Sequence, residues 1–387
     1  MRERCEIVYA AGRADRLAHF AVDEGRLDAA AAYTIETMRA AYPTLAIPFH
    51  SRWRHFEVGG LDRWAAFRDG LERATPDEIA RRQIDLAVVS VLLDAGAGPD
   101  WRYHEAETGQ TYARSEGLGV ASFRLFTGAV FAARADAETL GTIDADRLTT
   151  AFQVTAANPL VGVEGRVTLL NRLGHTIAAA PTFFGTPPRV GNLFDYFRAL
   201  AAGRPLPAAS ILVVLLRALE GVWPSATSVD GIALGDVWYH PAVRTGDASD
   251  GLVPFHKLSQ WLAYSLIEPL EAGGIAVTDL DGLTGLAEYR NGGLFIDVGV
   301  LVPKAPAALQ EVHAVGSELV VEWRALTLAC LDRVADRIRA QLGRTAVEFP
   351  LAKVLEGGSW RAGRRIAAAR RAGGEPPIRI ASDGTVF

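Results

Sequence analysis

Cysteine is scarce in this sequence of 387 residues, which contains only Cys5 and Cys330. Their wide separation matches neither a zinc-binding spacing nor the framework of a disulfide-rich secreted domain, so we expect a reducing, cytoplasmic compartment. The first residues, MRERCEIVYAAGRADR, lack the apolar centre of a signal peptide. A run of about 18 apolar residues is also missing, so the sequence predicts no membrane span.

Several motifs of known chemistry are absent as well. The sequence has no Walker A loop, no HExxH, no nucleophile elbow and no dinucleotide fingerprint between a strand and a helix. Its eight histidines show no metal-ligand spacing, and the arginines around His50 and His55 would repel a cation. We therefore expect neither a metal nor a cofactor. The formal net charge of −5 argues against nucleic-acid binding through overall charge.

The sequence does contain a series of helical patterns. Nearly half of its residues are hydrophobic and 22% are charged, which is typical of a globular protein. Periodicity and capping signals predict a mainly α fold, a single large helical unit over 1–387, with two lobes of about 1–200 and 201–387 as an alternative. The predicted helices cover 12–24, 26–42, 60–71, 75–96, 192–203, 208–224, 251–270, 316–343 and 359–371, with Gly343 as the stop of the longest one. Short strands are predicted in 294–302 and in 378–387, where Asp383-Gly384 would make a turn.

The segment 251–270, GLVPFHKLSQWLAYSLIEPL, has an unusual polar stripe. At 100° per residue, Gln260, Trp261, Tyr264 and Glu268 fall within about 60° of Lys257. A solvated face would carry more lysine, arginine and glutamate, whereas this one carries a lone lysine, an amide, a phenol and an indole. The stripe therefore either faces a bound ligand or is a surface stripe that packs through Trp261.

Two further stretches place charges among apolar residues. In AEYRNGG, Glu288, Tyr289 and Arg290 precede a predicted Gly-Gly turn, which would place the carboxylate in a cleft or, alternatively, in water beyond a helix end. In ELVVEWRALTLACL, Glu322 and Arg324 interrupt an apolar helix. Because unpaired buried charges are costly, we expect both to have partners, in a structural ion pair, in a site, or in both.

Two basic stretches are candidates for binding an anion. In LEGGSWRAGRR, a predicted Gly-Gly turn leads to a helix start, where free amides suit a phosphate. FHSRWRHFEVGG places basic residues beside aromatic ones. A basic solvated face is the alternative for each stretch. The candidate residues are Ser359, Arg361, Arg364 and Arg365 in the first stretch and Arg52, Arg54 and His55 in the second.

Ten stretches, distributed over nearly the whole chain, resemble the uracil catabolism protein 4 family, whose domain has no assigned function. The resemblance implies a place in a pathway that opens the uracil ring on a ribose phosphate scaffold, with a ribosylurea-type intermediate. The stretches are PFHSRWRHFEVGGLDRW, SVLLDAGAGPDWRYHE, RSEGLGVASF, NPLVGVEGR, GDVWYHP, GLVPFHKLSQWLAYSLIEPL, DLDGLTGLAEYRNGGLFID, GSELVVEWRALT, LAKVLEGGSWRAGRRIA and SDGTVF.

A more distant resemblance covers about 255–333. FHKLSQ, LTGLAEYR and EWRA are similar, in this order, to motifs of the queuosine salvage family. Those proteins are helical nucleotide N-glycosidases related in shape to helix-hairpin-helix DNA glycosylases, so the resemblance implies that fold in the C-terminal half. Glu288 stands where that family has its catalytic aspartate, and NGG stands where it has Val-Pro-Gln.

Together these features predict a hydrolase that cleaves the N-ribosidic bond of a ribosylurea phosphate or a related ribonucleotide. Glu288 would stabilise the oxocarbenium-like state, and Lys257 with Gln260 and Tyr264 would act on the leaving nitrogen. Tyr289, Glu322 and the arginines would bind the remainder of this small molecule. A ureido or amide hydrolase of the same pathway and a noncatalytic binding protein are the alternatives. We expect no nucleic-acid or membrane partner, and the oligomeric state is open.

Overall fold

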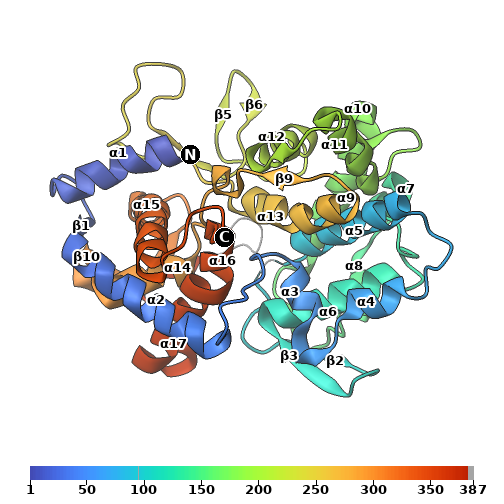
Figure 1. The fold of residues 1–387 in the computed structure, drawn as a ribbon, viewed down its shortest axis with the longest axis horizontal. Coiled ribbons are helices and arrows are strands. Elements are labelled where there is room, and N and C mark those ends of the chain that lie inside the picture. The colour runs from blue at the N-terminus through green and yellow to red at the C-terminus, as the bar shows by residue number, and fades with distance from the viewer. Residues whose placement is uncertain (95, 382–387) are drawn as a thin grey trace. The chain divides into compact units, whose positions relative to one another are not determined.

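The computed structural model describes residues 1–94 and 96–381 as a mainly helical chain whose strands are two to four residues long (Figure 1). The predicted mainly α fold is confirmed. The described chain forms two compact units. The first contains Met1–His50, Ser225–Gln260 and the described chain from Leu280 onwards, and the second contains Ser51–Pro224 and Trp261–Asp279. Each unit combines segments from both halves of the sequence, so neither matches a lobe of 1–200 or 201–387.

The first unit consists of helices with four small two-stranded sheets. Its elements are α1 (Arg2–Arg13), β1 (Phe20–Val22), α2 (Leu27–Ala41), β5 (Ser228–Val229), β6 (Ile232–Ala233), β7 (Val237–Tyr239), β8 (Leu252–Pro254), the start of α13 (Lys257–Ala272), α14 (Tyr289–Val298), β10 (Leu301–Pro303), β11 (Val312–Ala314), α15 (Glu318–Leu342), α16 (Leu351–Val354), α17 (Trp360–Arg370) and β12 (Arg379–Ala381). The pairs β1–β10, β5–β6 and β7–β8 are antiparallel, and β11–β12 is parallel.

Helix α15 forms the centre of the first unit. Every residue from Leu319 to Leu331 is buried, and the helix packs against α1, α2 and α14 (Figure 1). It ends at Gly343, whose φ of 61° is the left-handed conformation that glycine adopts at little cost. The predicted helix and its stop are therefore confirmed.

The second unit contains most of the shorter helices. Its elements are α3 (Trp53–Phe56), α4 (Arg63–Arg68), α5 (Pro76–Leu92), β2 (Arg102–Glu105), β3 (Gln110–Ala113), α6 (Arg114–Thr127), α7 (Ala137–Gly141), α8 (Ala145–Ala151), α9 (Val163–Ala179), α10 (Pro181–Phe184), α11 (Leu193–Ala201), β4 (Leu206–Pro207), α12 (Ala208–Ala218), the remainder of α13, and β9 (Val277–Thr278). Strands β2 and β3 pair antiparallel, and β4 and β9 pair parallel.

Helix α5 is the core of the second unit, as its sequence predicts. The Thr75 hydroxyl accepts the backbone N–H of Glu78 at 3.2 Å, so Thr75 caps the helix. Its C-terminal half, Gln83 to Leu92, is buried without interruption, and the helix packs against α6, α9 and α11. None of the described helices combines the length and the apolar character that crossing a membrane requires.

The sequence-based prediction was wrong at the N-terminus. A helix was expected over 12–24, but α1 covers Arg2–Arg13, and the chain then turns at Asp15, whose φ is 55°. Residues Phe20–Val22 pair instead with Leu301–Pro303 as β1 and β10. This pairing partner lies far away in sequence, so local periodicity contained no sign of it.

The predictions for the region around α14 also need correction. Gly292 and Gly293 lie inside α14 and form no turn. The segment 294–302, expected as a strand, is helical to Val298, and only Leu301–Pro303 forms a strand. The predicted C-terminal strand exists as β12, and the predicted Asp383-Gly384 turn lies outside the described residues.

The Gly-Gly pair before Trp360 does not form a turn either. The chain continues from α16 through a π-helical segment, Leu355–Ser359, into α17. A Cβ on Gly357 would approach Ile47 to 2.5 Å, and one on Gly358 would approach Met38 to 2.3 Å. These glycines therefore allow close packing, and the free helix N-terminus predicted there for a phosphate does not exist.

Glycine also allows α17 to lie against the start of α14, and substituting it tests this contact. A Cβ on Gly363 would lie 2.1 Å from the Arg290 carbonyl oxygen. We expect Gly363→Ala to lower the free energy of unfolding by about 1–3 kcal/mol, because backbone must move to relieve the overlap. Gly141→Ala is the matched control, since Gly141 is also helical but has open space around it. Equal stabilities of both variants in urea unfolding would contradict the tight contact.

Candidate active site

A buried ion pair in the first unit brings three of the sequence motifs together. The two Nη atoms of Arg324 each donate to the Asp236 carboxylate at 2.7 Å, and Arg324 Nε donates to the Ala287 carbonyl oxygen at 3.2 Å. Asp236 also accepts the backbone N–H of Lys257 at 3.0 Å. The start of α13, the residue before Glu288 and helix α15 are therefore held by one pair of side chains.

Sequence reasoning missed Asp236, although the stretch GDVWYHP that contains it was singled out. The turn before β7 positions Asp236, and the indole N–H of Trp238 donates to it at 2.8 Å. Burial alone would raise the pKa of Asp236, but Arg324 and these N–H donors outweigh burial, so the pKa lies below its ordinary value. An acid in a Gly-rich turn next to aromatic residues was the available signal.

The middle of the polar stripe of α13 is buried and is not a solvated surface. Gln260 is fully buried, and its Oε1 accepts the backbone N–H of Thr284 at 3.3 Å. Tyr264, which belongs to the second unit, is also fully buried. Lys257 is half-buried at the start of the helix. Gln260 thus connects α13 to the loop that leads to Glu288.

Glu288 caps the N-terminus of α14 and is only 6% exposed. Its carboxylate accepts the backbone N–H of Asn291 at 2.6 Å and that of Arg290 at 3.0 Å. The partial positive charge of a helix N-terminus stabilises a negative charge at this position. The alternative that placed Glu288 in water beyond a helix end is therefore wrong. The carboxylate is fixed in position by two donors of its own helix.

Two arginines and two aromatic rings contact one another around Arg290, which follows Glu288 at the start of α14. The guanidinium carbon of Arg290 is 4.8 Å from the ring centroids of both Tyr289 and Trp360. The guanidinium carbon of Arg364 is 5.0 Å from the same Trp360 centroid. Within the described chain, Arg290 makes no hydrogen bond or ion pair through its side chain. Stacking thus holds Arg290 while its N–H donors stay available.

The other residues of the predicted GGSW cluster form ion pairs within the first unit or are buried in it. Arg361 pairs with Glu356 at 3.0 Å, and Arg365 pairs with Glu36 at 2.6 Å. Ser359 is fully buried, and its hydroxyl has no hydrogen-bond partner among the described residues. Of the arginines predicted in this stretch, only Arg364 lies over the Trp360 ring that Arg290 also contacts.

The second predicted basic stretch belongs to the second unit. Arg52 is fully buried and donates to Asp94 at 2.6 Å. Arg54 pairs with Glu268 at 2.7 Å, and His55 packs edge-on against Trp261. These contacts give all three residues structural partners, and their binding of an anion stays a prediction.

Glu322 and Arg324 have different partners. It is fully buried, and Oε1 accepts the backbone N–H groups of His19 at 3.1 Å and Phe20 at 2.7 Å. Its Oε2 lies 3.5 Å from Nε2 of His240, another residue that sequence reasoning missed. Both charges in EWRA are therefore partnered, as the cost of burying them requires.

A possible metal-ligand group also includes Glu322. In the part of the chain that the structure describes, the donor atoms of His19, Glu318 and Glu322 lie within 4.8 Å of one another. Nitrogen and carboxylate donors of this kind suit a divalent transition metal. No sequence spacing could indicate this group, because His19 is about three hundred residues from the other two.

The comparisons with known proteins agree with the sequence resemblance. Residues 1–387 match a family profile described as "Protein of unknown function (DUF1688)". The chain belongs to this family. It is 37% identical over 407 residues to "Protein urg3" of Schizosaccharomyces pombe, covering 100% of this chain and 96% of the relative. It is 36% identical over 407 residues to "Uracil catabolism protein 4" of Lachancea kluyveri, covering 95% and 92% respectively. The predicted family is confirmed, and the likeness to queuosine salvage proteins stays a prediction.

The central role of Asp236 can be tested through the pH dependence of stability. Its pKa in the folded protein lies below that of the unfolded chain, about 3.9. Its stabilising effect is therefore complete above about pH 4 and is lost as the pH falls through the lower, folded value. We expect Asp236→Asn to lower the free energy of unfolding at pH 7 by about 3–5 kcal/mol, because Arg324 loses its partner. The difference from wild type should shrink below about pH 4 in urea unfolding.

Asp230→Asn is the control for this experiment, because Asp230 is exposed in the turn between β5 and β6. It should change stability by less than about 0.5 kcal/mol at every pH. An Asp236→Asn protein as stable as this control at pH 7 would show that the pair does not organise the unit.

Proposed function

We propose that this protein hydrolyses an N-ribosidic bond during uracil catabolism, with a ribosylurea phosphate or a related ribonucleotide as its substrate. The name of one relative, "Uracil catabolism protein 4", supports the pathway. The observation that carries the proposed chemistry is the geometry of Glu288. It is a buried carboxylate that two backbone N–H groups orient, in the motif whose counterpart in queuosine salvage proteins is catalytic.

In the proposed reaction, the bond between the anomeric carbon and the urea nitrogen breaks, and an oxygen from water bonds to that carbon. Ribose phosphate and urea are the products, and urea takes up a proton as it leaves. Positive charge develops on the ribose ring in the oxocarbenium-like transition state. The fixed carboxylate of Glu288 would stabilise this charge without reorganising during the reaction.

The leaving nitrogen needs a proton or a strong hydrogen bond, and we assign this task to Lys257. Its backbone is bound to Asp236, and Asp236 is bound to Arg324, which also holds the residue before Glu288. Asp236 and Arg324 therefore act as positioning residues. Arg290 and Arg364 would bind the phosphate, and this remote binding energy can contribute to the chemical step.

The carboxylate charge can be removed with little change of shape by Glu288→Gln. We expect turnover of ribosylurea phosphate to fall by about a hundredfold or more, because the transition-state charge loses its partner. Stability should fall by only about 1 kcal/mol, since one amide oxygen can still cap α14. Asp144→Asn is the matched control, because Asp144 caps α8 through the N–H of Arg147 at 2.8 Å. It should leave turnover unchanged.

The products of the same assay separate the candidate functions. Release of ribose phosphate together with intact urea supports the proposal. Release of ammonia from the ureido group would indicate the alternative ureido hydrolase. Binding without any product would indicate a noncatalytic protein. Normal release of ribose phosphate by Glu288→Gln would remove Glu288 from the mechanism.

The phosphate contact is tested by the double variant Arg290→Gln, Arg364→Gln. A phosphate ester brings roughly two negative charges near neutral pH. We expect KM for the phosphorylated substrate to rise at least about tenfold, while KM for the dephosphorylated compound changes little. Arg365→Gln is the control, since Arg365 follows Arg364 in α17 but pairs with Glu36. Equal effects on both substrates would disprove a phosphate contact at these arginines.

A further inference from the structure

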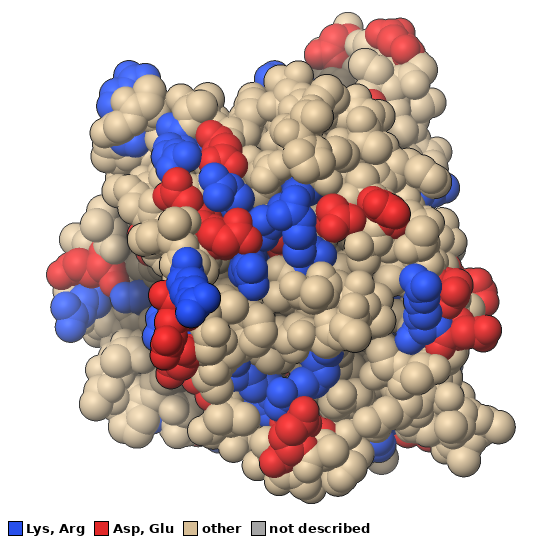
Figure 2. All heavy atoms as spheres, turned by 90° about the vertical axis from the view of Figure 1, so that its right-hand side faces the viewer, with Lys and Arg blue, Asp and Glu red and all other residues tan. Residues whose placement is uncertain are grey.

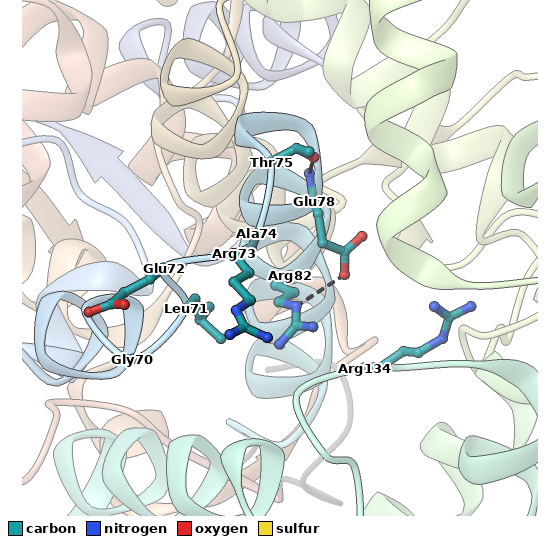
Figure 3. Close-up of a pocket in the computed structure, with 9 residues that line it drawn as sticks. All are labelled: Gly70, Leu71, Glu72, Arg73, Ala74, Thr75, Glu78, Arg82 and Arg134. Carbon is teal, nitrogen blue, oxygen red and sulfur yellow. Dashed lines mark hydrogen bonds and ion pairs between the residues drawn. The ribbon is translucent and has the colours of Figure 1, made fainter.

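A pocket in the second unit is lined by arginines that the sequence motifs did not indicate. Its volume is about 600 Å³, and Arg73, Arg82 and Arg134 all contribute to its wall. In the view of Figure 3, Arg73 and Arg82 lie on one side of the pocket and Arg134 lies on the other. Arg73 lies in the segment before α5, Arg82 in α5, and Arg134 between α6 and α7. Three separate parts of the chain thus bring guanidinium groups to one hollow.

Two of these guanidinium groups are poorly neutralised. The side chain of Arg73 makes no hydrogen bond or ion pair with any described residue. Arg134 Nε lies 3.8 Å from a carboxylate oxygen of Asp136, which is too long for a hydrogen bond. Arg82, by contrast, donates to Glu78 at 3.0 Å (Figure 3). Arg73 and Arg134 therefore retain most of their N–H donors.

Glu78 does not compensate for these two arginines. Both of its carboxylate oxygens already accept from Arg189 at 3.0 Å, and one also accepts from Arg82. Burial tends to raise the pKa of Glu78, but the hydrogen bonds from Arg189 and Arg82 outweigh it, so the pKa lies below its ordinary value. Its single negative charge is shared between two cations. Together with Glu72, the lining holds two carboxylates and three guanidinium groups, so the pocket has a net formal charge of +1.

A neighbouring hollow contains an arginine that is fully paired. It has a volume of about 560 Å³ and shares Glu78 and Arg134 with the first pocket. There, however, Arg81 forms two hydrogen bonds with Asp195, each of 2.8 Å. On the face drawn in Figure 2, most basic side chains likewise lie beside acidic ones. Arg73, which lines only the first pocket and has no ion pair among the described residues, departs from this pattern.

We infer that this pocket binds a small oxyanion that carries at least two negative charges, of the phosphate or phosphate-ester class. Guanidinium groups match the oxygen geometry of a phosphate and form short, charge-assisted hydrogen bonds with it. Groups on opposite walls can bind different oxygens of one anion. The volume lies within the range of small-molecule sites, and Leu71 and Ala74 add apolar wall for the organic part of an ester.

The anion site is independent of the proposed N-ribosyl hydrolysis. Its affinity is measured by the binding of inorganic pyrophosphate, an experiment that involves no turnover. Isothermal titration calorimetry on the full chain should be carried out at a constant ionic strength of about 0.15 M, which screens long-range attraction to the protein as a whole. We expect saturable binding to the wild type with one pyrophosphate per chain.

The double variant Arg73→Gln, Arg134→Gln should weaken pyrophosphate binding at least about tenfold, because two charge-assisted contacts are lost. The control is Arg147→Gln, Arg244→Gln, which removes the same charge from exposed arginines paired with Asp144 and Asp250. It should bind within about twofold of wild type. The thermal unfolding midpoint without pyrophosphate should be nearly the same for both variants, because Arg134, Arg147 and Arg244 lose only exposed ion pairs and Arg73 has none with a described residue.

Two results would overturn the inference. One is the absence of saturable pyrophosphate binding by the wild type, which would mean that the arginines form only a solvated surface. The other is equal weakening by the double variant and by the charge-matched control, which would mean that pyrophosphate responds to net charge alone. Loss of Glu288-dependent turnover bears on neither result, so the two proposals can fail separately.

Discussion

The first unit depends on the buried pair of Arg324 and Asp236. An arginine in the middle of an apolar helix would be very costly without a partner, and the carboxylate that supplies one lies 88 residues earlier in the chain. The same two side chains bind the backbone of Lys257 and of Ala287. Removing either partner would leave a buried charge and would also release the segments on both sides of the candidate site. Stability and site geometry are therefore consequences of one interaction.

The ion pair that each candidate arginine forms determines how much of its charge is left to attract an anion. Most predicted cations, including Arg52, Arg361 and Arg365, pair with nearby carboxylates and so contribute to the fold. An arginine whose charge is already neutralised has little electrostatic affinity left for a ligand. Two of the residues that keep their donors are Arg290, which lies against aromatic rings, and Arg73, which has no partner among the described residues. Neither was distinguishable from the others by composition or spacing.

Glycine pairs illustrate why the sequence misled in two places. Gly292-Gly293 and Gly357-Gly358 were both taken as turns, because glycine commonly occupies turn conformations. In the structure both pairs are helical, and each lies where a Cβ would collide with a neighbouring side chain. Absence of a side chain permits both a turn and close packing, so the choice between them depends on what lies opposite. The consequence is functional, because the helix start expected to bind a phosphate was lost with the second turn.

The sequence by itself determined the parts whose information is local. The periodicity and capping signals of α5 and α15 predicted both helices correctly, the long motifs predicted the family, and the cost of burial predicted that Glu322 and Arg324 would have partners. Only the tertiary structure decided which partners these are, and it alone paired β1 with β10 and brought Arg73 and Arg134 to one pocket. The reason is physical. A helix forms through contacts three or four residues apart, whereas charges and strands pair with groups that chain folding brings from anywhere in the sequence.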